Sequence, residues 1–598
     1  MTDRPTKYAE LVMQWLSELG YTHCYFVAGG NIMHLLDGAR TRMTCIPVVH
    51  EVAAGIAVEY FNEANGEGRA FALVTAGPGV TNILTAMGGA WLESRELLVL
   101  AGQVKSSDLA TDGVRQRGIQ EIDGVSLAKP VAKVSKCITK PLPASDFVGS
   151  VLEGRRNRPG PVFLEFCLDA QGAPVDEMSL GNLSEVDVTV GPDISMLKTA
   201  KSVAPEIVEH LKRASRPVIL IGGGISRSLV SEYHSELSAI NVPLMTTWNG
   251  TDRLESSAAN YFGRPNTWGQ RHANIILSQA DLILALGTRL GLQQTGFNWQ
   301  AFAKGAFVIH VDVDSAELTK GHPRTDLAVQ ADANVILAEV VKADYERNGE
   351  WFDYCGEIAS LFPLNDKDNE TRAEFVSPYD FYSDLSRLAA SNDIIIPCSS
   401  GGANSVSMQV IEQKYGQVII TDKGLASMGY GLAGAIGAAM AHPGRRTWLV
   451  EGDGGFSQNL QELATVEVNN LPIKTFIFAN EGYGSIRMTQ KNYFGGAYLG
   501  CDTQTGLGFP DWPQLFSAYN IPSKAITKTW ATDPDVQSLL ASEGPAAFIV
   551  PIDPLQTYWP KITSRITDTG SMESNPLHLM TPDIAIDDQT RVFRYVRP

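Results

Sequence analysis

The stretch Thr447-Trp-Leu-Val-Glu451, followed directly by Gly452-Asp453-Gly454, indicates a buried strand that ends in a glycine turn. A second apolar run, Lys474-Thr-Phe-Ile-Phe-Ala479, ends in the same way at Asn480. As neighbouring parallel strands, the two runs would bring a carboxylate, a side-chain amide and a backbone carbonyl together at the carboxyl edge of one sheet, where ligands of open α/β sheets bind. Such oxygen donors suit Mg²⁺ that also binds a diphosphate. The stretch therefore predicts a doubly wound parallel sheet with a metal–diphosphate site at its edge.

The spacing of the two halves makes this motif specific. Gly-Asp-Gly alone is ordinary turn chemistry, and average composition places it by chance in roughly a fifth of chains of this length. Here an asparagine follows the aspartate 27 residues later (480 − 453), and an apolar strand precedes each half. Glycines at these turns let backbone N–H groups come close to phosphate oxygens.

This pattern resembles the signature of thiamine-diphosphate enzymes, in which a Gly-Asp-Gly motif is followed at this distance by an asparagine. The resemblance implies that Mg²⁺ is held by Asp453, Asn480 and Gly482. It also implies that the diphosphate lies beside Gly454, Gly455, Asn480, Gly482 and Tyr483.

The family has a partner residue far away in the sequence, and this chain supplies one. Val48-Val49-His50-Glu51 precedes a helical pattern over Val52–Phe61. In the family, the glutamate at this place hydrogen-bonds N1′ of the aminopyrimidine, which allows the 4′-imino group to remove the thiazolium C2 proton. Taken alone, Glu51 would also fit a solvated helix start favoured by the helix dipole. The glycine loop Thr75-Ala-Gly-Pro-Gly-Val-Thr-Asn82 fits the family too and favours the catalytic interpretation.

Two further loops of the same region resemble cofactor loops of the family. Ser399-Ser-Gly-Gly-Ala-Asn404 follows an apolar strand and should cradle phosphate through Gly402, Ala403 and Asn404. In Gly424–Gly431, the carbonyl of Ala426 would accept from the 4′-amino group, and Met428 would wedge between the two cofactor rings. An isolated methionine is otherwise most often a core residue.

Composition and length restrict the class of protein. The 598 residues exceed a single core, so several domains are expected. A net charge of −18 argues against nucleic acid or an anionic membrane surface as the main partner. Seven cysteines without a CxxC pair indicate a reducing compartment, and the sequence shows neither a leader pattern nor an apolar run of transmembrane length. We therefore expect a cytoplasmic protein.

Alternating strand and helix signals predict three doubly wound α/β domains. The predicted units are a pyrimidine-binding domain over residues 1–185, a central FAD- or nucleotide-binding-like domain over 195–350, a diphosphate-binding domain over 370–557, and a tail over 558–598 that wraps over the surface. The polar stretches 169–192 and 365–371 are interpreted as linkers.

The middle unit resembles the flavin-binding domain of acetolactate synthases. The segments Ile221–Ile225, Asp281–Arg289 and Val308–Glu317 carry this likeness. It implies an FAD held by Gly222, Gly223, Thr288, Arg289 and Asp312, without net redox chemistry. Alternatively, Asp312 and Asp314 cap the next helix, and the domain has lost its flavin.

The resemblance to acetolactate synthase covers nearly the whole chain, with two departures. Leu290–Gly296 replaces a segment whose arginine would hold the carboxylate of the second keto acid, and Thr489 stands where the family has a tryptophan that shapes acceptor choice. The segment Ser485–Gln490 is more similar to FAD-containing carboligases of the yersiniose-biosynthesis type, and Arg487 would contact an anionic group of the acceptor or pair with an acid.

Three residues of the first unit are further catalytic candidates. Gln120, within Arg115–Glu121, would lie near the reacting centre. Asn31 and His34 stand where cyclohexane-1,2-dione hydrolase, a related flavoprotein, has two histidines three residues apart. His34 would relay protons or simply pack at a helix start.

The sequence therefore predicts a thiamine-diphosphate-dependent carboligase that decarboxylates pyruvate or a similar 2-oxo acid and transfers the remaining unit to a ketone, keto-sugar or 2-oxo acid. The alternatives are acetolactate synthase proper, a hydrolase of a cyclic 1,2-diketone, and a non-catalytic homologue. The family places its cofactor between the first domain of one subunit and the third domain of another, which implies a homodimer or homotetramer. The expected partners are small molecules and further copies of the chain.

Overall fold

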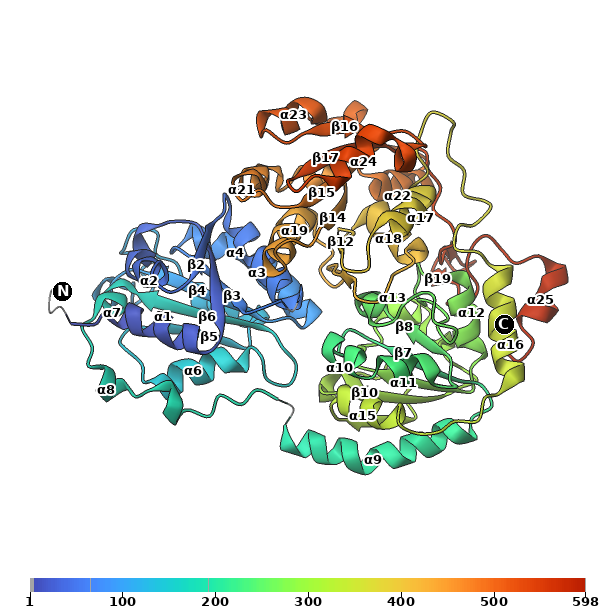
Figure 1. The fold of residues 1–598 in the computed structure, drawn as a ribbon, viewed down its shortest axis with the longest axis horizontal. Coiled ribbons are helices and arrows are strands. Elements are labelled where there is room, and N and C mark those ends of the chain that lie inside the picture. Colours follow the sequence, from blue (N-terminus) through green and yellow to red (C-terminus); the bar gives the residue numbers. More distant parts are fainter. Residues whose placement is uncertain (1–4, 65, 192, 399, 597–598) are drawn as a thin grey trace.

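The computed structural model describes residues 5–596 apart from 65, 192 and 399, and Figure 1 shows three units, each built on a parallel sheet. The sheets have six, five and six strands. Helices lie between the strands along the chain and cover the sheets, as the predicted α/β class requires. No helix of the described residues is long and apolar enough to cross a membrane.

The first sheet has the order β2-β1-β3-β4-β6-β5, and all of its pairings are parallel. Its strands are β1 (Tyr21–Phe26), β2 (Thr44–Pro47), β3 (Arg69–Val74), β4 (Leu97–Gln103), β5 (Val134–Ile138) and β6 (Pro161–Cys167). The main helices are α1 (Tyr8–Glu18), α2 (Met33–Ala39), α3 (Glu51–Ala64), α4 (Pro78–Glu93) and α6 (Ala144–Glu153). The alternation of strands and helices predicted for this unit is confirmed.

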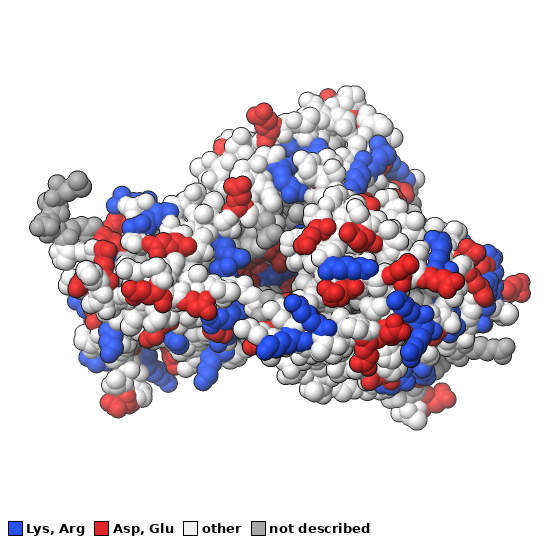
Figure 2. Space-filling model, turned by 60° about the horizontal axis from the view of Figure 1, so that its bottom comes forward, with Lys and Arg blue, Asp and Glu red and all other residues white. Residues whose placement is uncertain are grey.

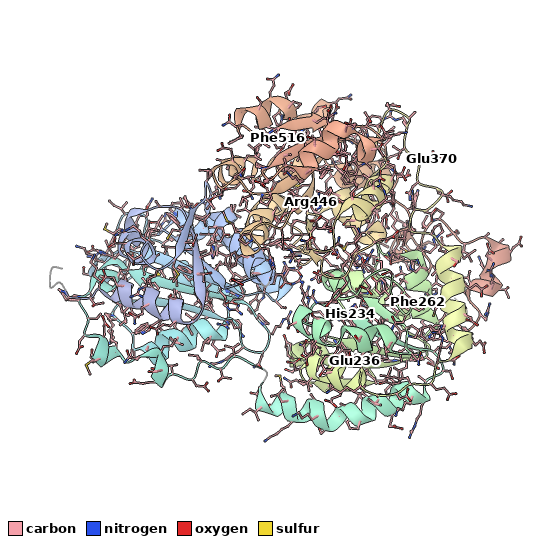
Figure 3. All side chains as sticks on the ribbon, in the orientation of Figure 1. His234, Glu236, Phe262, Glu370, Arg446 and Phe516 are labelled. Carbon is pink, nitrogen blue, oxygen red and sulfur yellow. The ribbon has the colours of Figure 1, made fainter. Side chains whose placement is uncertain are left out.

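The central sheet has the order β11-β10-β9-β7-β8. Its strands are β7 (Pro217–Ile221), β8 (Leu244–Thr246), β9 (Leu282–Leu286), β10 (Phe307–Asp312) and β11 (Leu327–Gln330). They are accompanied by α9 (Ile194–Arg213), α10 (Arg227–Glu232), α11 (His234–Ala239), α12 (Arg271–Gln279), α15 (Ala333–Val340) and α16 (Gly349–Leu361). Figure 3 labels His234 and Glu236 on α11, and Phe262, which packs edge-on against Phe352 of α16.

The third sheet has the order β13-β12-β14-β15-β17-β16. Its strands are β12 (Ile394–Ile396), β13 (Val418–Ile419), β14 (Thr447–Gly452), β15 (Ile473–Ala479), β16 (Ser523–Ala525) and β17 (Ala546–Pro551). Its main helices are α17 (Pro378–Leu388), α18 (Gly401–Val410), α19 (Tyr430–Ala441), α22 (Gly484–Phe494), α23 (Trp512–Ala518) and α24 (Pro534–Ala541). The neighbouring parallel strands β14 and β15 confirm the pairing predicted from residues 447–479.

The first and third units are joined by α3 and α19, which lie side by side. Glycines in α19 allow this close approach, because a Cβ atom on Gly437 would lie 2.0 Å from the carbonyl oxygen of Ala57. One continuous apolar cluster runs through both units and includes Tyr60 and Tyr430. This packing fixes the start of α3, where Glu51 lies, relative to the third unit.

Two predicted connecting segments have more structure than expected. The stretch predicted as a linker from residue 169 begins inside α7 (Leu168–Gly172), whose buried Gln171 donates to the carbonyls of Asn31 and Phe166. The C-terminal tail returns to the central unit, where α25 (Ile586–Val592) lies near α16 and Tyr354 donates to the carbonyl of Val592. The predicted domain boundaries stay predictions.

Candidate active site

The aspartate of the Gly-Asp-Gly motif holds the second half of the motif directly. Asp453 Oδ2 accepts from the backbone N–H groups of Asn480 (3.0 Å) and Gly482 (3.3 Å), while Oδ1 accepts from Gly454 (2.7 Å). The side chain is only 2% exposed, and burial raises its pKa to about 6. A bound cation would remove this cost, because it compensates a desolvated carboxylate. The three residues predicted to hold the metal therefore lie together.

The donor set fits Mg²⁺ and a diphosphate together better than a metal bound by protein alone. Among the described residues, no group of three or more His, Cys, Asp and Glu side chains is placed to hold a metal. One carboxylate, one amide and one carbonyl leave coordination positions for phosphate oxygens and water, which is the usual arrangement for Mg²⁺ in phosphate sites.

Glycines of the motif are required by close packing as well as by ligand approach. A Cβ atom on Gly454 would lie 2.2 Å from the ring of Tyr483, and one on Gly482 would lie 2.2 Å from the carbonyl oxygen of Cys501. A Cβ atom on Gly455 would lie 2.9 Å from Glu451. The ring of Tyr483 therefore packs on the motif, and its place beside the diphosphate stays a prediction.

Arg487 donates to the carbonyls of this loop and lies beside an acid, which supports the second of its two predicted roles. It is 7% exposed and donates to the carbonyls of Pro554 (3.1 Å) and Glu481 (3.3 Å), with longer bonds to Asn480. It also faces Asp502 at 3.6 Å, which is the acid pairing considered as the alternative. The guanidinium donors of Arg487 are used by these carbonyls, because the tight turn after β15 leaves several carbonyls without helix or sheet partners.

The predicted phosphate loop begins α18. Gly401 has a left-handed φ of +71°, and a Cβ atom on Gly402 would lie 2.8 Å from the ring of Tyr558. Ala403 and Asn404 are buried in the first turn, where the Ala403 carbonyl accepts from Tyr382 and Asn404 Oδ1 accepts from Thr421. Ser399 lies outside the described residues. The first-turn N–H groups fit an anion, because they have no partners within the helix.

The part of the candidate site that was predicted to bind the aminopyrimidine begins at the first residue of α3. Glu51 is 9% exposed, and its Oε2 accepts from Asn82 Nδ2 at 2.9 Å. The carboxylate of Glu462, in the third unit on η7 (Leu460–Glu462), accepts from the backbone of Val49 (3.1 Å) and His50 (3.0 Å). The third unit of the same chain thus holds the segment that leads to Glu51.

Gln120 lies at the glycine loop that carries Asn82. Its backbone is left-handed, with φ +63°, and its carbonyl oxygen would lie 2.5 Å from a Cβ atom on Gly77. The structure thus brings Gln120 to the same loop as the hydrogen-bond partner of Glu51. No hydrogen bond or ion pair among the described residues joins Glu51 to Asp453.

Asn31 and His34 lie against α7. The Asn31 carbonyl, in η1 (Gly30–Ile32), accepts from Gln171 of α7 at 2.7 Å, and the buried side-chain amide nitrogen of Asn31 has no hydrogen-bond partner among the described residues. His34 Nε2 would lie 2.9 Å from a Cβ atom on Gly172, and burial and Lys7 lower the pKa of His34. The structure therefore supports the packing alternative for His34 and shows no hydrogen bond from it to Glu51.

The loop that carries Ala426 and Met428 is shaped by two carboxylates that the sequence reading missed. Asp422 Oδ1 accepts from Leu425 and Ala426, and Glu93 accepts from Lys423 at 2.8 Å and from Gly424. Burial and the proximity of Glu93 raise the pKa of Asp422 to about 7. Ala426 adopts φ +54°, and Met428 is 37% exposed, so this methionine is not a core residue.

A cavity of about 900 Å³ opens where the central unit meets the other two. Figure 2 shows the molecule hollowed between its lobes, with charged side chains in the hollow. Of the residues predicted to bind FAD, the cavity is lined by Gly223, Thr288, Arg289 and Asp312. Gly222 instead lets the turns after β7 and β9 contact each other. A Cβ atom added at Gly222 would lie 2.2 Å from the Gly287 carbonyl oxygen, so a larger residue would not fit there.

The two aspartates after β10 have separate roles. Asp314 Oδ1 caps α14 (Ser315–Thr319) by accepting from Ala316 at 2.9 Å, and its Oδ2 pairs with Arg158 at 2.5 Å. Asp312 stays at the cavity, where burial raises its pKa. The cavity thus provides a glycine turn, a carboxylate and ample volume, which fit a dinucleotide.

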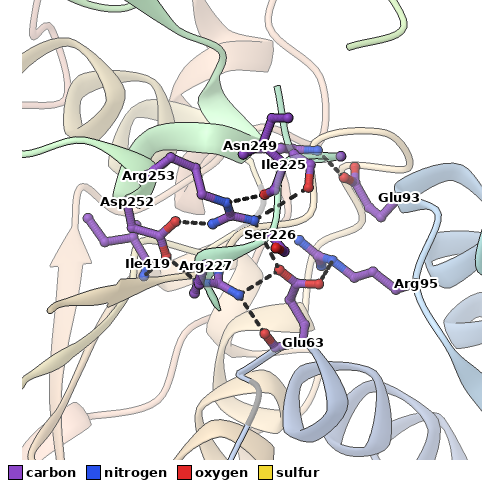
Figure 4. Close-up of polar contacts among 12 residues, drawn as sticks. Glu63, Glu93, Arg95, Ile225, Ser226, Arg227, Asn249, Asp252, Arg253 and Ile419 are labelled. Atoms are coloured by element: carbon purple, nitrogen blue, oxygen red, sulfur yellow. Dashed lines mark hydrogen bonds and ion pairs between the residues drawn. The ribbon is translucent and has the colours of Figure 1, made fainter. Parts of the chain in front are cut away.

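An ionic network forms the floor of this cavity and joins all three units (Figure 4). Arg227 pairs with Glu63 of α3 at 2.9 Å and with Asp252 at 2.8 Å. Asp252 also pairs with Arg253 and accepts from the backbone of Ile419 in β13 at 2.8 Å. Burial would raise the pKa of Asp252, but the two facing arginines lower it. The network fixes the units around the cavity.

Comparison with known proteins divides the chain in the same way. The N-terminal TPP binding domain of thiamine pyrophosphate enzymes matches residues 6–127, their central domain matches residues 205–340, and their C-terminal TPP binding domain matches residues 400–550.

Several acetolactate synthases are similar over most of their length. The isozyme 2 large subunit of Escherichia coli (strain K12) is 27% identical over 576 residues, which cover 94% of this chain and 99% of the relative. The probable large subunit of Methanocaldococcus jannaschii is 28% identical over 570 residues, 92% of each chain. The large subunit of Corynebacterium glutamicum is 27% identical over 553 residues, 88% of this chain and 84% of the relative.

Fold, site and matches together define a thiamine-diphosphate-dependent enzyme, and the chain belongs to the thiamine pyrophosphate enzymes. Within them it is an acetolactate synthase-like enzyme that forms carbon–carbon bonds.

Proposed function

We propose that this enzyme decarboxylates pyruvate or a similar 2-oxo acid and adds the remaining unit to a ketone or keto-sugar. The proposed class of acceptor is inferred from the segment that follows β9. Residues 290–296 contain no cation, and the buried Gln294 of α13 (Leu292–Thr295) is used internally, donating to the Pro265 carbonyl at 2.6 Å. A second 2-oxo acid would bring a carboxylate, which needs a cationic partner when desolvated.

The donor half of the reaction rests on Glu51, Asn82 and the metal motif. Bound thiamine diphosphate supplies an electron sink for the electrons released when carbon dioxide leaves. Glu51 Oε2 is held by Asn82, which leaves Oε1 to hold a proton at the aminopyrimidine. Asp453 and the Asn480–Gly482 turn would hold Mg²⁺ and thereby orient the diphosphate.

The decisive experiment is an assay of carbon dioxide release from pyruvate with Mg²⁺ and thiamine diphosphate, with and without a panel of neutral ketones. Acceptor-dependent release and a new hydroxyketone support the proposal. Rapid formation of acetolactate with no preference for ketones contradicts it and favours the second candidate, acetolactate synthase proper, which the names of the relatives support. No release from pyruvate would favour cleavage of a cyclic 1,2-diketone.

We further propose that FAD occupies the 900 Å³ cavity, since Gly223, Thr288, Arg289 and Asp312 line it. The visible spectrum of the purified protein tests this directly. A flavin band that survives gel filtration supports FAD, and a protein that stays colourless after incubation with FAD contradicts it.

We also propose a homodimer or homotetramer with the active site shared between subunits. Apolar side chains near both half-sites are exposed on the single chain, among them Ile119 in the first unit and Met428 and Ile486 in the third. Exposed apolar residues beside a functional site indicate a surface that a partner covers. Sedimentation of the purified protein tests this assembly, and a stable active monomer would contradict it.

A further inference from the structure

Two cysteines of the first unit lie in contact at one edge of its sheet. Cys137 belongs to β5, which is the edge strand, and Cys167 is the last residue of the neighbouring β6. Both are free thiols, and their Sγ atoms lie 3.9 Å apart in a hydrogen bond between the two thiols. A disulfide bond is about 2.05 Å long, so the sulfurs need to approach by only roughly 2 Å to be joined.

The register of the two strands explains why the thiols meet. Cys137 lies opposite Glu165 in the pairing of β5 with β6, and Cys167 follows Glu165 by two residues along β6. Because side chains alternate between the two faces of a strand, Cys137 and Cys167 point to the same face. The sheet itself therefore holds the two thiols side by side.

The two thiols differ in access and in acidity. Cys137 is exposed, whereas Cys167 is fully buried. The hydrogen bond from Cys167 lowers the pKa of Cys137, while the same contact and burial raise the pKa of Cys167. The thiolate is the form that attacks a disulfide. Cys137 is therefore the thiol that a reagent in solution reaches first, and Cys167 is placed to react with Cys137.

We propose that Cys137 and Cys167 form a dithiol site that a low-molecular-weight disulfide, such as oxidised glutathione, converts reversibly into a disulfide. This modification goes beyond the proposed carbon–carbon bond formation and does not depend on it. The disulfide would join the ends of β5 and β6 covalently.

The exchange takes place in two balanced steps. The Cys137 thiolate attacks one sulfur of the oxidant, the S–S bond of the oxidant breaks, and the first leaving thiolate takes up the proton that Cys137 has lost. Cys167 then attacks Cys137 Sγ, the mixed disulfide breaks, and the second leaving thiolate takes up the proton of Cys167. The two cysteines lose two electrons, and the oxidant gains them as it becomes two thiols.

A second pair of neighbouring cysteines in the same sheet supplies a matched control. Cys24 of β1 and Cys45 of β2 lie opposite each other, and β2 is the other edge strand of this sheet. The variant Cys45→Ser removes one thiol of that pair and leaves Cys137 and Cys167 as they are. It therefore controls for general effects of replacing a cysteine at the edge of this sheet.

The test uses the full-length protein with Mg²⁺ and thiamine diphosphate, and its variants Cys137→Ser, Cys167→Ser and Cys45→Ser. Each protein is equilibrated with mixtures of reduced and oxidised glutathione, and the remaining thiols are then blocked by alkylation. Trypsin cleaves after Arg155 and Arg156, which separates Cys137 from Cys167. A disulfide between these cysteines therefore appears in mass spectrometry as two linked peptides that a reductant separates.

A buried cysteine outside the sheet reports whether the protein stays folded during this treatment. Cys355 of α16 is fully buried, so it should be alkylated only after denaturation. Circular dichroism of each variant confirms folding independently.

We expect linked peptides in the wild type and in Cys45→Ser, and their complete loss in Cys137→Ser and Cys167→Ser. The last two variants should also differ from each other. Cys167→Ser should accumulate glutathione on Cys137, because the thiol that resolves the mixed disulfide is missing. Cys137→Ser should leave the buried Cys167 unmodified. Excess reduced glutathione should restore both thiols in the wild type.

Absence of linked peptides in wild-type protein treated with oxidised glutathione alone would overturn the proposal. A stable glutathione adduct on Cys137 of the wild type would also overturn it, because Cys167 would then fail to resolve the mixed disulfide. The same holds for a disulfide that excess reduced glutathione does not open. Linked peptides that form only when Cys355 is alkylated as well would belong to unfolded protein and would equally contradict it.

Discussion

The first and third sheets share one strand order but present different chemistry. In β2-β1-β3-β4-β6-β5 and β13-β12-β14-β15-β17-β16 each strand has a counterpart, and all pairings are parallel. The counterpart strands β2 and β13 are followed by α3 and α19, the two helices that pack together. The fold is therefore repeated, and the functional differences reside in the loops after the strands.

Carboxylates in the two sheets show how far these loops have diverged. After β2, Glu51 starts a helix and is bound by the side chain of Asn82. After β13, Asp422 holds the backbone of its own loop instead. In the third sheet, Asp453 directly follows β14 and Asn480 directly follows β15, and the backbone N–H of Asn480 donates to Asp453. We propose that the first sheet serves proton transfer and the third sheet serves binding, which mutations can test.

The largest effect is expected from Asp453→Ala in the third sheet. Removing this carboxylate takes away a proposed metal ligand and the acceptor for the Asn480 and Gly482 amides. We expect loss of Mg²⁺-dependent thiamine diphosphate binding and a fall in kcat/KM of at least about 10³-fold. Calorimetric titration and the decarboxylation assay measure both. Asp511→Ala, which removes the cap of α23, is the control, and retained cofactor binding in Asp453→Ala would refute the metal assignment.

Glu51→Gln in the first sheet should separate proton transfer from binding. Glutamine can still accept from Asn82, so the loop should keep its shape. We expect kcat to fall about 10²–10³-fold while the Kd of thiamine diphosphate changes only a few-fold. The exposed Glu67→Gln serves as the control. Full activity in a folded, cofactor-bound Glu51→Gln protein would remove Glu51 from the mechanism.

The strands and the metal motif could be predicted from the sequence because they are local patterns. The strands β14 and β15 are buried continuous apolar runs, and each is followed at once by its functional residue. Glu462 and Glu93 could not be found in this way, because they bind backbone groups more than 300 residues away. The carbonyl partners of Arg487 could not be predicted for a related reason: they are brought to it only by the folded turn.

Combining Glu51→Gln and Asp453→Ala chains in one dimer tests whether the two parts of an active site come from different chains. If each site combines Glu51 of one subunit with Asp453 of another, a mixed dimer contains one intact site and one doubly altered site. Co-expression of Glu51→Gln and Asp453→Ala should then restore roughly a quarter of wild-type activity. Differently tagged chains allow the mixed species to be isolated and assayed. No recovery in isolated mixed dimers would place both halves of a site in one chain.

The smallest expected effect concerns a buried acid in β6 of the first sheet that has no equivalent in β17, the counterpart strand of the third sheet. Burial, and to a lesser extent Cys137, raises the pKa of Glu165 in β6 from 4.5 to about 8, and Glu165 Oε1 has no hydrogen-bond partner in the part of the chain that the structure describes. The counterpart β17, Ala546–Pro551, carries no ionisable side chain. Since the folded pKa lies above the unfolded one, folding favours protonated Glu165. Its stabilising contribution is complete below pH 4.5 and is lost as the pH rises through about 8.

Glu165→Gln should remove this dependence, because the amide keeps the size of the acid and cannot ionise. The difference in unfolding free energy between variant and wild type should shift in favour of the variant by up to about 4 kcal/mol between acidic and alkaline pH. Denaturant unfolding from pH 5 to 9 measures this difference, with the surface variant Glu153→Gln as control. Parallel pH profiles for Glu165→Gln and wild type would show that folding does not raise the pKa of Glu165, and β6 and β17 would then not differ in this respect.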